Sequence, residues 1–368
     1  MATETSSAPL NVEVTNEVIG KGGFGVVRRG VLNGDAIAVK EIDLAKLKAR
    51  DATSEETLMR EVAVSAGLDH PNVLKTYGWR KDENKHVYMY LELLRGPELQ
   101  QVLDARGAFS ESEVKVITRQ IVDALNYLHH RKIVHRDVKA ENVMLTEPLA
   151  DKKAALDGCT VKLLDFGLAR QLGVKRQPRA SVLQGGGGGG GSRRGSIFDR
   201  VLGKASSALG ATSRLASSTS ATNRTSVVHV VPPPALPKAE SSYIAESSTI
   251  ELSCVGTKGY APPQLTGAGP GATKVNVGDF DHAVLVDAFA VGKLLRYMLC
   301  GIEPEQSVME AVEGVGCLAQ LGCGGRRVIE PQQLSPPARD LMERLSKKDA
   351  AERMALIEAR GHDWLAEA

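Results

Sequence analysis

A glycine-rich segment near the start of the chain has the composition of a phosphate-binding loop. It runs Gly20-Lys21-Gly22-Gly23-Phe24-Gly25-Val26-Val27 and fits the pattern GxGxxGxV. Residues without side chains let backbone N–H groups come close to phosphate oxygens. Dinucleotide-binding proteins share such glycines, but there a helix follows them directly. Here the chain continues as VVRRGVLNGDAIAVK, which predicts strands around a turn. A glycine-rich hairpin over phosphates is therefore the interpretation that we favour.

A lysine on the next predicted strand could meet the same phosphates. Strand alternation from residue 36 to residue 40 places Lys40 on the same face as Ala38. A buried cation at that position needs a partner or an anion. Glu61, within a helix predicted over residues 54–68, could supply the carboxylate. Taken alone, such a pair is more often two ordinary surface charges, so its interpretation depends on the motifs that follow.

Two polar motifs later in the chain carry a family resemblance. The first is His135-Arg136-Asp137-Val138-Lys139-Ala140-Glu141-Asn142, which fits HRDxKxxN, and the second is Asp165-Phe166-Gly167. Each is a weak signal by itself. Their order after the glycine-rich segment and Lys40 resembles the eukaryotic protein kinase superfamily, specifically its serine/threonine type. The resemblance covers roughly residues 12–365, apart from an insertion.

This resemblance implies chemical roles for four residues. Asp137 would orient the acceptor hydroxyl and take its proton. Lys139 would lie near the transferred phosphoryl group, and its place in the motif resembles serine/threonine kinases. Lys40 would hold the α- and β-phosphates of ATP and pair with Glu61. The implied activity is transfer of the γ-phosphoryl group of ATP to a protein hydroxyl.

The resemblance also implies binding sites for ATP and Mg²⁺. Asn142 and Asp165 would bind the magnesium ions that bridge the phosphates. Residues 88–94 resemble the last strand and hinge, with Leu91 at the gatekeeper position. The expected ATP contacts are Ile19, Gly20, Lys21, Gly22, Gly23, Phe24, Gly25, Val26, Val27, Ala38, Lys40, Glu92, Leu94, Glu98 and Met144.

Hydrophobic patterning predicts the elements that must position these motifs. Strand patterns over residues 12–42 and 87–94, with the helix at 54–68, predict a β-rich N-lobe at 12–94. Helical spacing after residue 110, over 282–300 and from 336 onward predicts a mainly helical C-lobe at 98–365. Residues 1–11 form an N-terminal tail. The predicted fold class is α+β, a two-lobed protein kinase-like fold.

The segment from about 171 to 248 interrupts the C-lobe pattern. It contains a glycine run at 185–191, a tract rich in Ser, Ala and Thr, and VPPPALP at 231–237. Such a composition buries too little apolar surface to offset chain entropy, which predicts a disordered insertion in the activation segment. Arg136 beside Asp137 is typical of kinases that an upstream kinase activates there. Ser253, just before a GTxxY-like turn at 256–260, is our first candidate phosphosite.

Two departures from the family pattern leave other functions open. Ser65 stands where relatives carry a large apolar side chain, so we expect a looser helix. Gln264 replaces a carboxylate that would pair with Arg353, so we expect a weaker interaction between residues 264 and 353. Both favour a pseudokinase scaffold, although the presence of every catalytic side chain argues against it. A small-molecule phosphotransferase is a third alternative, disfavoured by Lys139 and the GTxxY-like turn.

Composition limits the partners and the compartment. Lys plus Arg number 46 and Asp plus Glu 44, a balance that argues against nucleic acid and anionic membrane surfaces as partners. The five cysteines form no CxxC pair, which favours reduced thiols and a cytoplasmic location and gives no ground against access to the nucleus. Glu98 and the motif ELLRG resemble the calcium/calmodulin-dependent group. The expected partners are therefore protein substrates with arginine upstream of the target residue.

Overall fold

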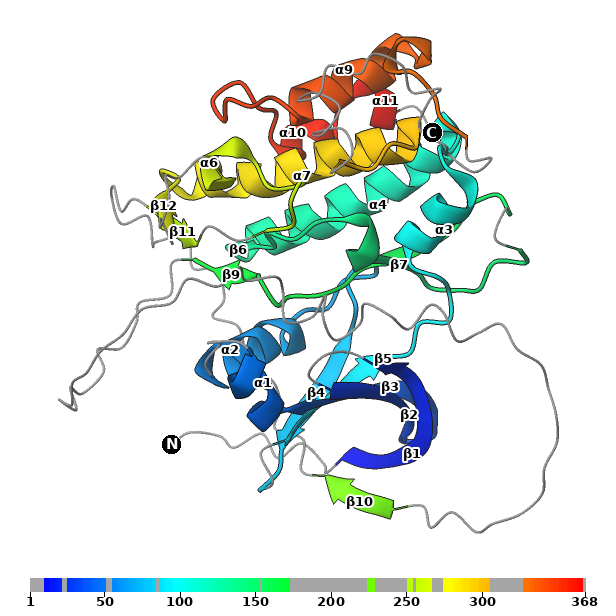
Figure 1. Cartoon of the computed structure of the whole chain (residues 1–368), viewed down its shortest axis with the longest axis vertical. Helices are drawn as coiled ribbons and strands as arrows, with labels where there is room; N and C mark the ends of the chain where they lie inside the picture. The colour runs from blue at the N-terminus through cyan, green and yellow to red at the C-terminus, as the bar shows by residue number, and fades with distance from the viewer. Residues whose placement is uncertain are drawn as a thin grey trace.

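The computed structural model describes residues 10–21, 25–50, 55–83, 86–151, 154–172, 224–228, 250–253, 256–266, 274–304 and 327–366, and all statements below refer to these residues. They form a lobe built on one sheet and a second lobe built on helices (Figure 1). The predicted two-lobed α+β fold is thereby confirmed. No helix in these ranges is both long and apolar enough to cross a membrane.

The N-lobe is built on an antiparallel sheet with the strand order β10-β1-β2-β3-β5-β4. Its strands are β1 (Leu10–Lys21), β2 (Gly25–Leu32), β3 (Asp35–Asp43), β4 (Thr76–Lys81), β5 (His86–Glu92) and β10 (Arg224–Val228). The β2–β3 hairpin turns at Asn33 and Gly34, whose φ angles are 52° and 98°. Positive φ at both turn residues matches the right-handed twist of the flanking strands, which explains the Asn-Gly pair.

Two helices, α1 (Leu44–Arg50) and α2 (Glu55–Ala66), follow β3. Leu58 and Val62 of α2 pack in one buried cluster with Ala38, Ile42 and Met89 of the sheet. The sequence predicted one helix in this lobe, and that prediction was incomplete. With seven residues, α1 is too short to display a helical period of apolar residues.

The C-lobe is organised around two long helices that lie side by side (Figure 1). Its helices are α3 (Leu99–Arg106), α4 (Glu111–His130), α6 (Pro263–Thr266), α7 (Phe280–Cys300), α9 (Pro336–Leu345), α10 (Leu356–Ala359) and α11 (Asp363–Ala366), with 3₁₀ turns η1 (Ala140–Asn142) and η4 (Pro331–Gln333). Leu125 and Leu128 of α4 share a large apolar core with Leu294 and Leu295 of α7. Burial of this core holds the strands that carry the polar motifs.

Three short antiparallel ribbons accompany the helices of the C-lobe. They are β6 (Ile133–Val134) with β9 (Arg170–Gln171), β7 (Val143–Leu145) with β8 (Val161–Leu163), and β11 (Glu251–Ser253) with β12 (Lys274–Asn276). The first two ribbons bracket the HRDxKxxN and DFG motifs. The third was not predicted from the sequence.

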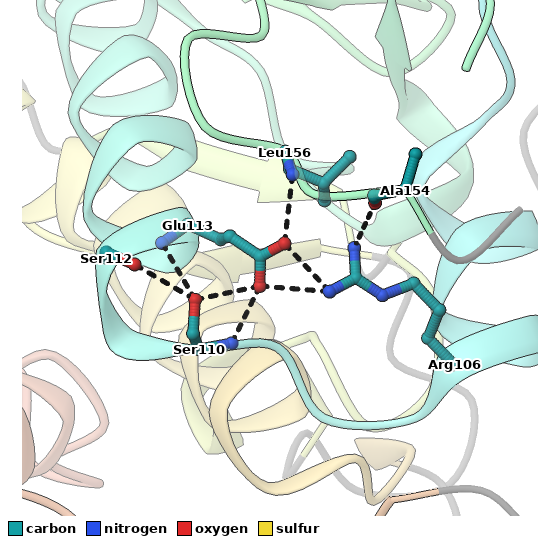
Figure 2. Close-up of polar contacts among 6 residues, drawn as sticks. All are labelled: Arg106, Ser110, Ser112, Glu113, Ala154 and Leu156. Carbon is teal, nitrogen blue, oxygen red and sulfur yellow. Dashed lines mark hydrogen bonds and ion pairs between the residues drawn. The ribbon is translucent and has the colours of Figure 1, made fainter. Parts of the chain in front are cut away.

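A buried carboxylate at the start of α4 anchors the β7–β8 loop (Figure 2). Glu113 is 3% exposed and closes a capping box with Ser110. Its carboxylate accepts hydrogen bonds from Arg106 Nη2 at 2.7 and 3.0 Å and from the Leu156 amide at 2.9 Å. Arg106 also donates to the Ala154 carbonyl at 2.8 Å. One ion pair therefore joins α3, α4 and the loop that leads into β8.

Most of the insertion predicted at about 171–248 lies outside the described residues. Its residues 224–228 form β10, paired with β1 from Leu10↔Val228 to Val14↔Arg224. The sequence of this stretch, RTSVV, is rich in β-branched residues, and the edge of β1 offers unpaired backbone groups. This strand is a difference from the expected disorder. β1 itself begins at Leu10, two residues before the predicted start of the lobe.

Candidate active site

A buried carboxylate of α7 holds the HRDxKxxN loop by accepting hydrogen bonds from its backbone. Asp287 is 0% exposed and accepts hydrogen bonds from the backbone amides of His135 at 2.9 Å and Arg136 at 2.7 Å. His129 Nε2 lies 2.8 Å from the same carboxylate. Burial acts to raise the pKa of Asp287, but these hydrogen bonds and the nearby histidines lower it by more. The carboxylate therefore stays ionised and holds the loop by charge-assisted hydrogen bonds.

His135 connects this loop to the DFG segment. Its ring is fully buried, and burial lowers its pKa, so the imidazole is neutral. The Asp137 amide donates to Nδ1 at 3.3 Å, which leaves Nε2 as the donor to the Leu164 carbonyl at 2.9 Å. The ring edge meets Phe166 with 5.3 Å between ring centroids. The two motifs are thus joined by both polar and aromatic contacts.

Asp137, Lys139 and Thr257 form a closed triangle of polar contacts. The Thr257 hydroxyl donates to Asp137 Oδ1 at 2.7 Å and accepts from Lys139 Nζ at 2.9 Å. Lys139 Nζ lies 3.3 Å from Asp137 Oδ2. Asn142 Nδ2 donates to the Asp137 carbonyl at 2.8 Å and to its Oδ2 at 2.9 Å. These contacts fix the Asp137 carboxylate in one orientation.

A backbone hydrogen bond connects the DFG segment, which begins at Asp165, to the HRDxKxxN loop. Asp165 has a left-handed φ of 61°, and its Oδ1 accepts the Gly167 amide at 2.8 Å. The Leu164 amide donates to the Asn142 carbonyl at 2.8 Å. This backbone contact ties the residue before Asp165 to Asn142, whose side-chain nitrogen donates to Asp137. Carboxylate and amide oxygens are suitable ligands for Mg²⁺.

The N-lobe contributes the predicted lysine. Lys40 is 1% exposed and lies on β3, facing the same side as Ala38 and Ile42. Glu61 lies in α2, but its side chain is outside the described part of the structure. The pairing of Lys40 with Glu61 therefore stays a prediction. Residues 22–24, including Phe24, are also outside the described ranges.

The chain between the lobes is fastened to both of them. Glu92 donates its amide to the Lys75 carbonyl at 2.9 Å, and its carboxylate lies 2.9 Å from Lys162 Nζ on β8. Gly96 is buried, and an added Cβ would collide with the Glu147 carbonyl. Since backbone cannot move aside as a side chain can, this close approach requires glycine. The linker thus lies directly on the end of β7.

The other predicted ATP contacts are distributed over the strands and linker near this point. Glu98 forms an antiparallel bridge with Met144. The remaining described residues are Ile19, Gly20 and Lys21 on β1, Gly25, Val26 and Val27 on β2, Ala38 on β3, and Leu94 in the linker. ATP contact by these residues remains a prediction.

Three residues of this site were absent from the predicted site residues: Thr257, Asp287 and His129. Thr257 belongs to the GTxxY-like turn that the sequence displays, and Asp287 lies within the predicted helix at 282–300. Their contacts with residues 118 to 152 positions away leave no local signal. His129 lies in the last turn of α4, six residues before the HRDxKxxN loop, and carries no signal of its own.

The departures from the family pattern have visible consequences. Gln264 Oε1 accepts a hydrogen bond from Arg353 Nη2 at 3.2 Å, so a neutral amide stands in for the expected carboxylate. Arg353 also donates to three backbone carbonyls, which fix it independently of Gln264. Ser65 is 4% exposed, and its hydroxyl donates to the Val62 carbonyl at 3.0 Å. Ser253 lies in β11, with its side chain outside the described part.

Comparison with known proteins agrees with this geometry. Residues 14–185 match the family model described as protein kinase domain. Mitogen-activated protein kinase kinase kinase 1a of Physcomitrium patens is 38% identical over 165 residues, which cover 45% of this chain and 20% of that protein. Serine/threonine-protein kinase PLK4 of Aedes aegypti is 36% identical over 159 residues, 42% of this chain and 19% of that protein.

A third relative is matched over a longer stretch. Calcium/calmodulin-dependent protein kinase type 1 of Macrobrachium nipponense is 23% identical over 360 residues, 96% of this chain and 74% of that protein. The chain thus spans about a fifth of the length of the first two relatives. The family match, the two-lobed fold and the order of the motifs agree in the likeness of residues 14–185 to a protein kinase domain.

Proposed function

We propose that this chain is a serine/threonine protein kinase that transfers the γ-phosphoryl group of Mg-ATP to a protein hydroxyl. The observation that carries the proposal is the triangle of Asp137, Lys139 and Thr257, with every joining distance between 2.7 and 3.3 Å. Phosphoryl transfer asks the protein for positioning and charge stabilisation more than for covalent chemistry. A carboxylate held in one orientation beside a lysine meets that demand.

Each member of the triangle has a distinct part in the proposed reaction. Asp137 orients the acceptor hydroxyl and takes its proton as the hydroxyl oxygen bonds to the γ-phosphorus, while the bond from that phosphorus to the β-phosphate oxygen breaks and ADP leaves. Lys139 stabilises negative charge on the transferred group. Thr257 holds the side chains of Asp137 and Lys139 in fixed positions relative to each other. Lys40, nearly fully buried on β3, binds the α- and β-phosphates, which offset the cost of burying its charge.

Asn142 and Asp165 are the proposed ligands of Mg²⁺. When bound, Mg²⁺ neutralises charge on the β- and γ-phosphates. Asn142 donates through its nitrogen to Asp137, so its oxygen is the atom suited to the metal. Asp165 is oriented by the Gly167 amide. Both side chains are buried, so each is already ordered before metal binds.

The substrate class and the regulators are inferred from the site and the relatives. The resemblance at Glu98 supports protein substrates with arginine upstream of the target serine or threonine. Glu92 and Leu94 would meet adenine through their backbones, with Met144 beneath it. Ser253 is the candidate for modification by an upstream kinase. We place this signalling activity in the cytoplasm.

Acceptor peptides that differ in one residue test the acceptor class. Three basic peptides carrying Ser, Thr or Tyr at the same position would be incubated with the purified chain and Mg-ATP. We expect transfer to Ser and Thr and at least about tenfold less to Tyr, because Lys139 lies in the loop that contacts the acceptor. Preferential transfer to Tyr would contradict the assignment.

A scaffold that binds nucleotide without transferring phosphate is the competing function. It is favoured by Ser65 at a buried position of α2 and by the neutral Gln264 at Arg353. Binding of Mg-ATP in calorimetry with no transfer to any acceptor would support the scaffold. Transfer to a serine peptide would exclude it.

A further inference from the structure

A two-stranded ribbon holds the activation segment immediately before the active site. Strand β11 pairs with β12 from Glu251↔Asn276 to Ser253↔Lys274. Two backbone hydrogen bonds extend the pairing beyond the strands. The Ile250 amide donates to a carbonyl of the turn after β12, that of Gly278, at 2.6 Å. Residues 250–253, which precede the GTxxY-like turn, are therefore paired through their backbone.

The second extending bond and the packing beneath the ribbon fix its position. The Val277 amide donates to the Ile250 carbonyl at 2.9 Å. Leu252 is 0% exposed and belongs to an apolar cluster with Val134 of β6, Leu172 after β9 and two residues of α7, Ala283 and Val286. In this cluster, side chains of β11, of β6 and of α7 pack against one another.

The partner strand of the ribbon continues directly into α7. Asn276 Oδ1 accepts the Gly278 amide at 2.9 Å, and Gly278 has a φ of 89°, which suits glycine. Asp279 then caps α7 by accepting the His282 amide at 3.0 Å. The same helix carries Asp287, which holds the catalytic loop. One helix thus anchors both the catalytic loop and the activation segment.

The other strand of the ribbon leads to the catalytic triangle. Thr257 follows the end of β11 by four residues. Its hydroxyl bonds Asp137 and Lys139. Any displacement of β11 would therefore move Thr257 relative to Asp137, and small displacements at a reacting centre lower the rate strongly.

We infer that the β11–β12 ribbon is the positioning element that orders residues 250–253 of the activation segment without phosphorylation. Backbone hydrogen bonds and the burial of Leu252 supply the ordering that a phosphate bound to arginine supplies elsewhere. The chain is therefore active before any phosphate is added to residues 247–253. A phosphate on Ser253, at the last pair of the ribbon, would act on a segment already in place. The inference rests on the proposed kinase activity.

The test combines phosphatase treatment with a variant that breaks the ribbon. Dephosphorylated full-length chain, verified by intact mass, is compared with Val277→Pro, which lacks the amide that bonds Ile250, and with Val277→Ile, which keeps it. We expect the dephosphorylated chain to transfer phosphate. For Val277→Pro we expect kcat to fall about three- to tenfold or more. KM for ATP should stay unchanged, and amide exchange at residues 250–253 should accelerate, whereas Val277→Ile should behave as the wild type.

A second pair of variants keeps the inference testable if Val277→Pro fails to fold. Leu252→Ala removes the buried anchor of β11, and Leu252→Met restores apolar volume. We expect the kcat lost in Leu252→Ala to return in Leu252→Met, again without a change in KM for ATP. A merely structural role would lower the active fraction of enzyme and leave kcat per active site unchanged in both.

The outcomes separate this inference from the proposed function. A dephosphorylated chain that is inactive until an upstream kinase modifies it would overturn the inference and leave the kinase assignment intact. Faster exchange at residues 250–253 with unchanged kcat would also overturn it. Absence of transfer in every phosphorylation state, with ATP still bound, would remove the proposed function and this inference with it.

Discussion

The Thr257 hydroxyl donates a hydrogen bond to the Asp137 carboxylate at 2.7 Å across 120 residues of sequence. The same hydroxyl accepts a hydrogen bond from the Lys139 ammonium. It therefore bridges the two groups to which we assign the proposed reaction. We expect Thr257→Val to lower kcat about ten- to a hundredfold, because the carboxylate loses its fixed orientation. Thr257→Ser keeps the hydroxyl and should retain most of the activity. Steady-state kinetics with a serine peptide would check this, and equal activity in the valine variant would argue against the bridge.

The pKa of Asp287 gives a prediction for stability against pH. Burial acts to raise that pKa, but hydrogen bonds from His129 and His135 lower it by more. Because the folded-state pKa is depressed, the stabilising contribution is present above the ordinary value of about 3.9 and is lost as pH falls through the folded-state pKa.

Asp287→Asn should therefore destabilise the chain by about 3 kcal/mol at pH 7, since the buried loop amides lose a charged acceptor. The difference in the free energy of unfolding between this variant and the wild type should become smaller below about pH 4. Urea unfolding at several pH values measures it. Asp340→Asn, at a carboxylate 45% exposed, is the control and should cost less than about 1 kcal/mol. A difference that stays constant down to pH 3 would mean that the charge of Asp287 is not responsible.

The close approach at Gly96 predicts a sensitive point in the linker between the lobes. An added methyl group would collide with the Glu147 carbonyl, which is backbone. Gly96→Ala should cost about 1–3 kcal/mol through overpacking and raise KM for ATP, since the predicted adenine contacts Glu92 and Leu94 lie just before it. Gly361→Ala is the control, because its nearest neighbour would be 3.7 Å away. Thermal unfolding and ATP titration would check both variants, and a tolerated Gly96→Ala would show that the linker can move away from β7.

The small side chain of Ser65 gives a prediction for turnover. It is 4% exposed on α2, at a position where the family resemblance implies a larger apolar side chain that joins the helix to Phe166. We expect Ser65→Leu to raise turnover, because added apolar contact stabilises the active position of α2. Ser65→Ala, which adds no volume, should stay near the wild type. Unchanged or lower turnover of the purified leucine variant would refute the expectation and indicate overpacking instead.

The sequence predicted the fold because its motifs are local. HRDxKxxN and DFG are short runs whose order implies two lobes, and the strand pattern around Lys40 is visible in a few residues. The geometry of Asp137 was less accessible. Its contacts with Thr257, and those of Asp287 with the loop, join residues more than a hundred positions apart. Resemblance to a family pointed to the GTxxY-like turn that contains Thr257.

The missed elements are those whose local signals are weakest. Helix α1 has seven residues, and β12 has three, Lys274–Asn276, within a glycine-rich stretch. Its pairing with β11 depends on the packing of Leu252 against α7, which no local pattern displays. Strand β10 lies in a region whose overall composition predicts disorder, so its five residues became interpretable only through their pairing with β1.

The most direct test of the central claim is transfer of labelled γ-phosphate from Mg-ATP to a basic serine peptide. Wild type would be compared with Asp137→Asn and Lys40→Met, with nucleotide binding measured in parallel. We expect wild-type transfer that Asp137→Asn reduces at least about a thousandfold while ATP still binds. Lys40→Met should abolish transfer as well. Transfer that persists in Asp137→Asn, or a silent wild type that binds ATP, would contradict the account.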